Sequence, residues 1–330
     1  MELMTKGRQF VDNIKNDKVF ANNRKKYITK SKGFLFWAFK IVILIGISYV
    51  ILGPLIGIIA NSFFSDADKT NSMVYVIPEE PTMERYRLAW LRLDYLKVLG
   101  QTLFYDLSLM AIQVIICSMV GYGFARFNFP LKKLLFGCVI IMIVIPTHSI
   151  MLPLYVTFQN FDFFGLSHLF GSNGARLLGS QIPMYIMSFF GCGLRAGLFI
   201  YIFNQFFRGL PKEIEEAAFV DGAGMWYTYF RIMLVNAIPS VITVSIFSMV
   251  WQYNDTFFAK LFNISDKIVI SKKISSLQAT IQNVDKILSP TLSRLYLYAG
   301  IVLVILPIVI MYVLLQRRFI EGVERSGIVG

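Results

Sequence analysis

The chain has 330 residues, of which 56% are hydrophobic and 16% are charged, and its formal net charge is +12. This balance is that of an integral membrane protein and excludes an ordinary soluble globular domain. The basic excess does not indicate a nucleic-acid partner, because no basic stripe with stacking aromatics stands outside the apolar segments.

Residues 1–33 form a polar segment with nine Lys and Arg residues against three acidic residues. Positive charges immediately before a membrane span favour the cytoplasmic side. We therefore expect a cytoplasmic basic tail that can contact anionic lipid. No cleavable signal peptide is expected, because this polar stretch precedes the first apolar run.

Six apolar runs are long enough to cross a bilayer core as helices, which takes about twenty residues each. Pro146 and Pro153 remove backbone donors from the third run and should kink or break it. Arg195 and several glycines interrupt the fourth run, whose ends the pattern does not define. The expected fold is all-α, one membrane domain over residues 34–315 with spans near 34–59, 103–124, 134–158, 179–203, 237–258 and 295–315.

Six spans return the chain to the side on which it started, so the 316–330 tail is expected in the cytoplasm with the N-terminus. The loop 209–235 is then cytoplasmic and the loop 259–293 is extracellular. That outer loop is rich in lysine, but long translocated segments follow the charge rule less closely. We expect it to be solvated, with a short helix. The first connection should carry either a short amphipathic helix near residues 85–96 on the outer face or an ordinary solvated loop.

A charged segment, LPKEIEEAAFVDGAGMWYTYFRIML at residues 210–234, interrupts the apolar pattern. Pro211 can open a helix, and the acidic residues after it favour the positive end of the helix. Gly222 permits a sharp turn, and the aromatic residues that follow supply an apolar face. Two interpretations fit: a short helix that inserts into a groove on another protein, or an ordinary interfacial helix.

The spacing of this segment is E-A-A, three residues, Gly, nine residues, then I-x-L. The matching residues are Glu216, Ala217, Ala218, Gly222, Ile232 and Leu234. The segment resembles the EAA loop of the permeases of binding-protein-dependent ABC importers. Val235 stands where that pattern has proline, which leaves the entry angle of the fifth span open.

Further motifs are similar to the carbohydrate-uptake branch of this family, which includes the shorter permease of maltose transporters. The resemblance extends from about Tyr86 to the C-terminus and implies a type I importer permease fold. Because the EAA loop is shared by importers of other solutes, a peptide or polyamine permease is the alternative. The motifs are GYGFARFNFP at 121–130, LPLY at 152–155, the stretch 197–224, WQYNDTFF at 251–258 and QRRFIEGVERSGIVG at 316–330.

The resemblance implies a transport subunit in a bacterial-type cell membrane, not an enzyme, that moves a sugar or oligosaccharide. It implies four kinds of partner besides the lipid bilayer and the sugar: a second homologous permease in a heterodimer, two copies of an ATPase and an extracytoplasmic solute-binding protein. The chain has no G-x-x-x-x-G-K-[ST] motif, so ATP chemistry must come from another chain. We expect no cofactor and no metal, because Cys117, Cys138 and Cys192 lack metal-ligand spacing.

In the resembling permeases the EAA helix carries motion from the ATPases to the spans. Glu215 and Glu216 would then offer charge-assisted hydrogen bonds to the ATPase. Ala217 and Ala218 would permit close backbone approach, and Gly222 would release the chain from the groove. Asp221 is the flanking acid of the DGA segment.

A second set of candidates lies near the outer end of the fifth span, at Trp251, Tyr253, Asn254 and Asp255. The polar members could bind sugar hydroxyls while the aromatic rings stack on a pyranose face. Alternatively, they cap the helix or join it to neighbouring spans. In the resembling permeases the outer loop 259–293 reaches toward the binding protein.

Two rivals from other classes remain weaker. A membrane enzyme would need a nucleophile, a base and metal ligands at one depth, whereas the two histidines, His148 and His168, have no second ligand at helical spacing. An ion-driven carrier would need acidic residues at the membrane midplane, and these are scarce.

Overall fold

The computed structural model describes residues 36–71, 77–162 and 174–327, without the side chains of Thr70, Leu315 and 317–327. The basic tail 1–33 lies outside these residues. The described residues are helical and contain no strand, only one antiparallel bridge between Phe161 and Ala175. The all-α prediction is therefore confirmed for this part of the chain.

The chain divides into two compact units, residues 1–60 and residues 61–330, where the sequence predicted one membrane domain. In the first unit the described residues belong to the helix Phe36–Ser62, which is long and apolar enough to cross a membrane. Its large apolar side chains are mostly exposed, as suits a surface in contact with lipid.

The second unit begins with α2 (Asp66–Thr70) and α3 (Glu84–Leu93). A capping box starts α2: the Ser65 hydroxyl accepts from the Asp68 amide, and the Asp68 carboxylate accepts from the Ser65 amide. The helix α3 confirms the amphipathic helix expected near residues 85–96, so the loop alternative is wrong. Asp94, in the left-handed conformation at φ 49°, ends α3 and leads directly into α4 (Tyr95–Arg126).

Two further helices coincide with predicted spans. α4 and the apolar part of α16 (Pro290–Gly327) are each long enough to cross a membrane. α16 ends at Gly327, so its helical backbone continues through most of the predicted C-terminal tail, residues 316–330.

The third predicted span is bent, as its prolines suggested. α5 (Lys132–Val144) ends before Pro146, and the turn η1 (Thr147–Ile150) with α6 (Met151–Gln159) continues at 106° to it. Pro153 causes no break, because it lies in the first turn of α6, where a missing N–H leaves no bond unmade.

The predicted span 179–203 is two helices, α8 (Ile182–Phe189) and α9 (Ala196–Gly209). Gly191 and Arg195 between them have φ of 70° and 59°, which a continuous helix cannot contain. Three helices in the described residues are thus long enough to span, or up to five if each bent pair counts as one span. The six expected spans are not six continuous helices.

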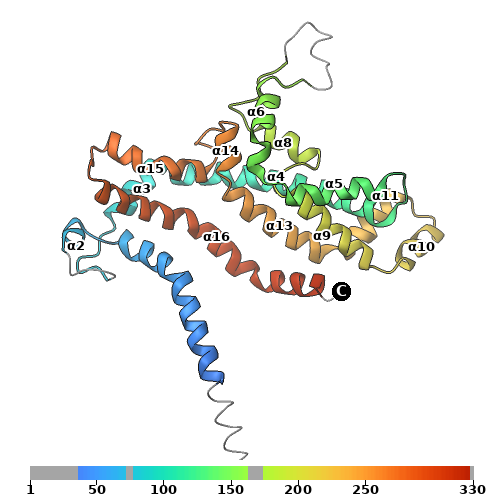
Figure 1. Cartoon of the computed structure of the whole chain (residues 1–330), viewed down its shortest axis with the longest axis horizontal. Coiled ribbons are helices and arrows are strands. Elements are labelled where there is room, and N and C mark those ends of the chain that lie inside the picture. Colours follow the sequence, from blue (N-terminus) through green and yellow to red (C-terminus); the bar gives the residue numbers. More distant parts are fainter. Residues whose placement is uncertain (1–35, 72–76, 163–173, 328–330) are drawn as a thin grey trace, which may run out of the picture. The chain divides into compact units, whose positions relative to one another are not determined.

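The connection between α13 and α16 is more ordered than the predicted loop. α13 (Ile238–Tyr253) leads through α14 (Phe257–Leu261) to α15 (Ile270–Val284), a helix of 15 residues. Figure 1 shows α15 beside α3 and the start of α16. Leu277 and Ile281 of α15 are buried there, so packing against neighbouring helices explains why this segment is not a solvated loop.

Close backbone contact sets the arrangement of the other end of this unit. A Cβ at Gly121 of α4 would lie 2.6 Å from the Cβ of Phe203 and 3.0 Å from the amide nitrogen of Asn204, both in α9. α4 also joins α13, because the Gln113 side-chain oxygen accepts from Ser248 at 2.6 Å. The ends of α4, α9 and α13 are therefore held together.

Candidate coupling site

The segment between α9 and α13 is built around the short helix α10 (Glu213–Val220). Three acidic residues lie in its first turn, Glu213, Glu215 and Glu216, where they complement the positive end of the helix. Figure 1 shows α10 and α11 at the end of the second unit, next to the ends of α5 and α9. The helix predicted from the sequence is therefore present.

Gly222 ends this helix in the left-handed conformation, with φ of +82°. The Gly222 amide donates to Phe219 O and the Ala223 amide to Ala218 O, which satisfies carbonyl groups at the helix terminus. No atom lies within 4 Å of a Cβ built at Gly222. The backbone angle, not a lack of space, is therefore what requires glycine.

The chain returns to the bundle through irregular helix. α11 (Met225–Tyr227) leads into a π-helical turn, η2 (Thr228–Met233), and then α12 (Leu234–Asn236). The axis bends by 77° between this group and α13. Pro239 lies in the first turn of α13, so the proline missing at Val235 has a counterpart at the start of the next helix.

The Glu215 side chain points into the protein and is only 10% exposed. Its Oε2 lies 3.0 Å from Nε of Arg126, the last residue of α4. Its Oε1 accepts a hydrogen bond from the Tyr122 hydroxyl, one turn earlier in α4. The Arg126 guanidinium also donates to Leu210 O at 2.9 Å, so α10 and the chain leading into it are both held to α4.

A second contact ties the π-helical turn to the same helix. The hydroxyls of Tyr229 and Ser118 share a hydrogen bond of 2.7 Å in the interior. The Tyr122 ring packs between those of Tyr229 and Phe207, at centroid distances of 5.1 and 5.3 Å. Both sides of the Gly222 turn are thus attached to α4.

The opposite side of the segment is exposed and apolar. We call it the coupling face, and its large side chains are Phe219, Val220, Met225, Trp226, Tyr227 and Phe230. Val220 is 86% exposed and Trp226 is 63% exposed. Glu216 and Asp221 are exposed beside it. Aromatic residues with an acidic rim form a surface suited to a groove on another protein.

The structure separates the residues predicted for coupling into two groups. Glu216, Ala217, Asp221 and Gly222 are exposed on this segment, whereas Glu215 and Ala218 are buried. The carboxylate of Glu215 is paired within the chain, in contrast to the expectation that it faces an ATPase.

Sequence reasoning did not single out the partners of Glu215 and of the π-helical turn. Tyr122 and Arg126 stand four residues apart in GYGFARFNFP, the spacing that places two side chains on one face of a helix. That spacing was the available signal for the Glu215 contacts. Ser118, a further turn earlier in the same helix, carried no comparable signal.

The candidates at the end of α13 make contacts within the chain. The Tyr253 hydroxyl donates to Val304 O at 2.6 Å, and Asp255 accepts from the Phe258 amide at the start of α14. The Trp251 ring stacks on Phe247. Asn254 is exposed and donates to Val250 O within its own helix. These contacts favour helix capping and packing for Tyr253 and Asp255.

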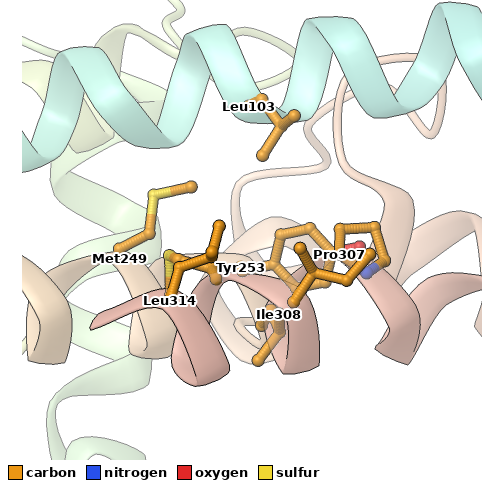
Figure 2. A pocket seen from close by; sticks show the side chains of 8 residues that line it. Leu103, Met249, Tyr253, Pro307, Ile308 and Leu314 are labelled. Atoms are coloured by element: carbon orange, nitrogen blue, oxygen red, sulfur yellow. The ribbon is translucent and has the colours of Figure 1, made fainter. Parts of the chain in front are cut away.

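Tyr253 also lines an apolar pocket of about 370 Å³ between α4, α13 and α16. Figure 2 shows Leu103 on one side of this pocket and Met249, Ile308 and Leu314 on the other. The Tyr253 hydroxyl, the one side-chain hydroxyl of the lining, is already used by Val304 O. The pocket therefore lacks the polar groups that sugar hydroxyls require.

The helices define a multi-pass membrane protein, and the coupling face is an apolar surface available to a partner. Residues 113–325 match the family described as binding-protein-dependent transport system inner membrane component, and the chain belongs to that family. It is therefore a transport permease subunit.

Two similar proteins are named as permeases of uptake or transport systems. The chain is 26% identical over 280 residues to the diacetylchitobiose uptake system permease protein NgcG of Streptomyces coelicolor, which covers 84% of each chain. It is 24% identical to the arabinooligosaccharides transport system permease protein AraQ of Halalkalibacterium halodurans, over 86% of this chain and 93% of that one.

A solved structure shares the fold. It is a chain of a bacterial ABC transporter involved in the import of the acidic polysaccharide alginate, with a TM-score of 0.69 and 19% identity. The match covers 86% of this chain and 96% of that chain. The type I importer permease fold predicted from the motifs is thereby confirmed.

Proposed function

We propose that this permease imports a sugar or oligosaccharide, driven by ATP hydrolysis in separate ATPase subunits. The cargo is inferred from relatives named for diacetylchitobiose uptake and for arabinooligosaccharide transport. These names favour carbohydrate over the peptide or polyamine alternative. The observation that supports the mechanism is that one side of the coupling segment is bound to α4 while the other side is exposed.

In the proposed mechanism, an ATPase binds the coupling face and moves α10 when two ATPase copies close on ATP. The Glu215–Arg126 pair and the Tyr229–Ser118 hydrogen bond transfer that motion to α4. Helices that pack as a rigid group then rotate together, which opens the pathway to the outer side. Glu216 and Asp221 offer charge-assisted hydrogen bonds to the ATPase, and Ala217 permits close approach.

The proposed complex has a second homologous permease as heterodimer partner, two ATPase copies and an extracytoplasmic solute-binding protein. Both ends of the chain and the coupling segment lie in the cytoplasm. Co-purification in mild detergent tests the composition. Labelling of a Glu213→Cys variant, in a chain whose Cys138 and Cys192 are replaced by Ser, with a membrane-impermeant thiol reagent tests the orientation, since labelling of residue 213 in intact cells would place α10 outside and refute it.

The decisive variant is Glu216→Lys in the reconstituted importer. Losing a hydrogen bond to a charged group costs about 1.5–3 kcal/mol, which is roughly a tenfold to hundredfold loss of ATPase affinity. We expect sugar uptake to fall accordingly, while the thermal unfolding of the purified permease stays unchanged because Glu216 is exposed.

Glu80→Lys makes the same charge change at another exposed glutamate and is the matched control. Uptake by Glu80→Lys should be normal. Equal uptake by Glu216→Lys and the wild type would refute the proposed coupling role.

For the substrate pathway we propose Asn254 as the contact residue, because it is exposed and its side-chain oxygen has no hydrogen bond in the described structure. Trp251 would add an aromatic ring beside it, while Tyr253 and Asp255 hold the helix end. Asn254→Ala should change the relative uptake of different sugars. Reduced assembly with unchanged sugar preference would show a structural role instead.

A further inference from the structure

A second feature lies beside the coupling segment, on the flank formed by α4, α5 and α9. A pocket of about 500 Å³ lies there, and its basic lining residues are Arg126, Lys132, Lys133, Arg208 and Lys212. No acidic residue lines it. We call it the cationic pocket. Its charge is concentrated where the ends of three membrane helices meet.

Most of this charge is uncompensated. Arg126 is paired with Glu215, but the other four cations have no ion-pair partner among the described residues. Lys132 donates to Phe127 O at 2.7 Å, which leaves its charge in place. Cations gathered in one pocket repel each other, so an anion bound among them would be stabilised by all four.

The helices that carry the basic residues of the pocket are closely packed on one another. A Cβ at Gly197 of α9 would lie 3.0 Å from Val139 O in α5, and Gly121 makes a similar approach between α9 and α4. Figure 1 shows α5 and α9 side by side. The basic residues at the ends of α4, α5 and α9 are therefore brought together by the backbone packing of these helices.

Two features indicate the kind of anion. Asn204 lines the pocket, and its buried Oδ1 has no hydrogen-bond partner, so it can accept from a hydroxyl group. Phe124 and Phe136 give the pocket an apolar wall. Leu134 and Leu135, in the same turn of α5 as the two lysines, are exposed as they would be toward lipid chains. The lining thus suits a molecule with a phosphate, a hydroxyl and an acyl chain.

We propose that the cationic pocket binds one anionic phospholipid with a glycerol headgroup. Its phosphate lies among Lys132, Lys133, Arg208 and Lys212, a headgroup hydroxyl donates to Asn204, and an acyl chain follows α5. Basic pockets between membrane helices on the cytoplasmic side bind anionic headgroups in this way. The site rests on the cytoplasmic placement of this end, which is part of the proposed function.

Native mass spectrometry of the full chain in mild detergent, with equal amounts of phosphatidylglycerol and phosphatidylcholine, tests the proposal. We expect the wild type to retain phosphatidylglycerol selectively. Lys133→Gln with Arg208→Gln should weaken that retention by roughly thirtyfold, the loss expected for two cations near an anionic group. Lys132→Gln with Lys133→Gln is a second pair, in case the first variant does not fold.

Lys260→Gln with Lys267→Gln removes two exposed cations elsewhere in the chain and should leave retention unchanged. Equal retention by the pocket variants and this control would overturn the proposal. So would release of the lipid by inorganic phosphate alone, which would indicate a free-anion site. Because the readout is lipid retention and not uptake, failure here is distinguishable from failure of the coupling mechanism.

Discussion

The two ends of the second unit each hold an ion pair, and the two pairs are buried to different extents. At the α3–α15–α16 end, Arg92 and Asp285 form an ion pair that is partly solvated, with side chains 31% and 13% exposed. At the coupling end, the pair of Arg126 and Glu215 is 6% and 10% exposed, yet an apolar face is left uncovered beside it. The first end therefore keeps its ion pair in contact with solvent, whereas the second buries its pair beneath the coupling face, as the proposed coupling role requires.

The largest expected effect breaks the buried pair. Arg126→Met leaves the Glu215 carboxylate buried without a cation, which should cost about 3–5 kcal/mol. Arg92→Met at the partly solvated pair should cost ~1 kcal/mol or less. Thermal unfolding of the purified chain, followed by far-ultraviolet circular dichroism, measures both. Equal shifts in the unfolding midpoint would remove the distinction between the two ends.

A smaller effect tests the helix contacts at each end. A Cβ at Gly121 meets backbone atoms of α9, while a Cβ at Gly300 meets the ends of the Leu277 and Ile274 side chains at 2.5 and 2.7 Å. Gly121→Ala should destabilise by the upper part of the about 1–3 kcal/mol range for overpacking, and Gly300→Ala by the lower part. A larger loss for Gly300→Ala in the same unfolding assay would show that the α3–α15–α16 end is the more rigid one.

The smallest effect concerns the loop before α3. Amides of Ser65, Glu79 and Glu80 donate to the Asp68 carboxylate, and the Ser65 amide is the main cause that lowers the pKa of Asp68 below its ordinary 3.8. A lowered folded-state pKa means that this stabilisation is complete above 3.8 and is lost as pH falls through the folded-state value.

Hydrogen exchange of residues 77–83, compared between the wild type and Asp68→Asn at each pH, measures this contribution. The two proteins should differ most above the ordinary carboxyl value and converge in acid. A difference that persists unchanged in acid would show that the charge of Asp68 is not what orders this loop.

Local features of the fold were predictable because neighbouring residues determine them. Pro146 bends its segment whatever packs against it, and Gly222 adopts a conformation that few other residues tolerate. The sequence also located α10 correctly, from the acidic residues in its first turn.

Features that depend on distant contacts were not predictable in the same way. Glu215 is buried because Tyr122 and Arg126, about ninety positions earlier in the chain, reach it across the bundle. α15 packs closely on α16, where Gly300 leaves room for the Leu277 and Ile274 side chains. In both cases the deciding partner lies on another element, which a reading of one segment cannot supply.

The turn at Gly222 interrupts the helical hydrogen bonding, so no continuous helix carries load from α10 into α13. In the proposed mechanism the load therefore passes through side chains into α4. With 32 residues at 1.5 Å each, α4 is a strut of roughly 48 Å that begins directly after α3 and ends at Arg126. In the proposed mechanism, a tilt of this strut about its Arg126 end also displaces Tyr95, so a push on α10 reaches the other end of α4.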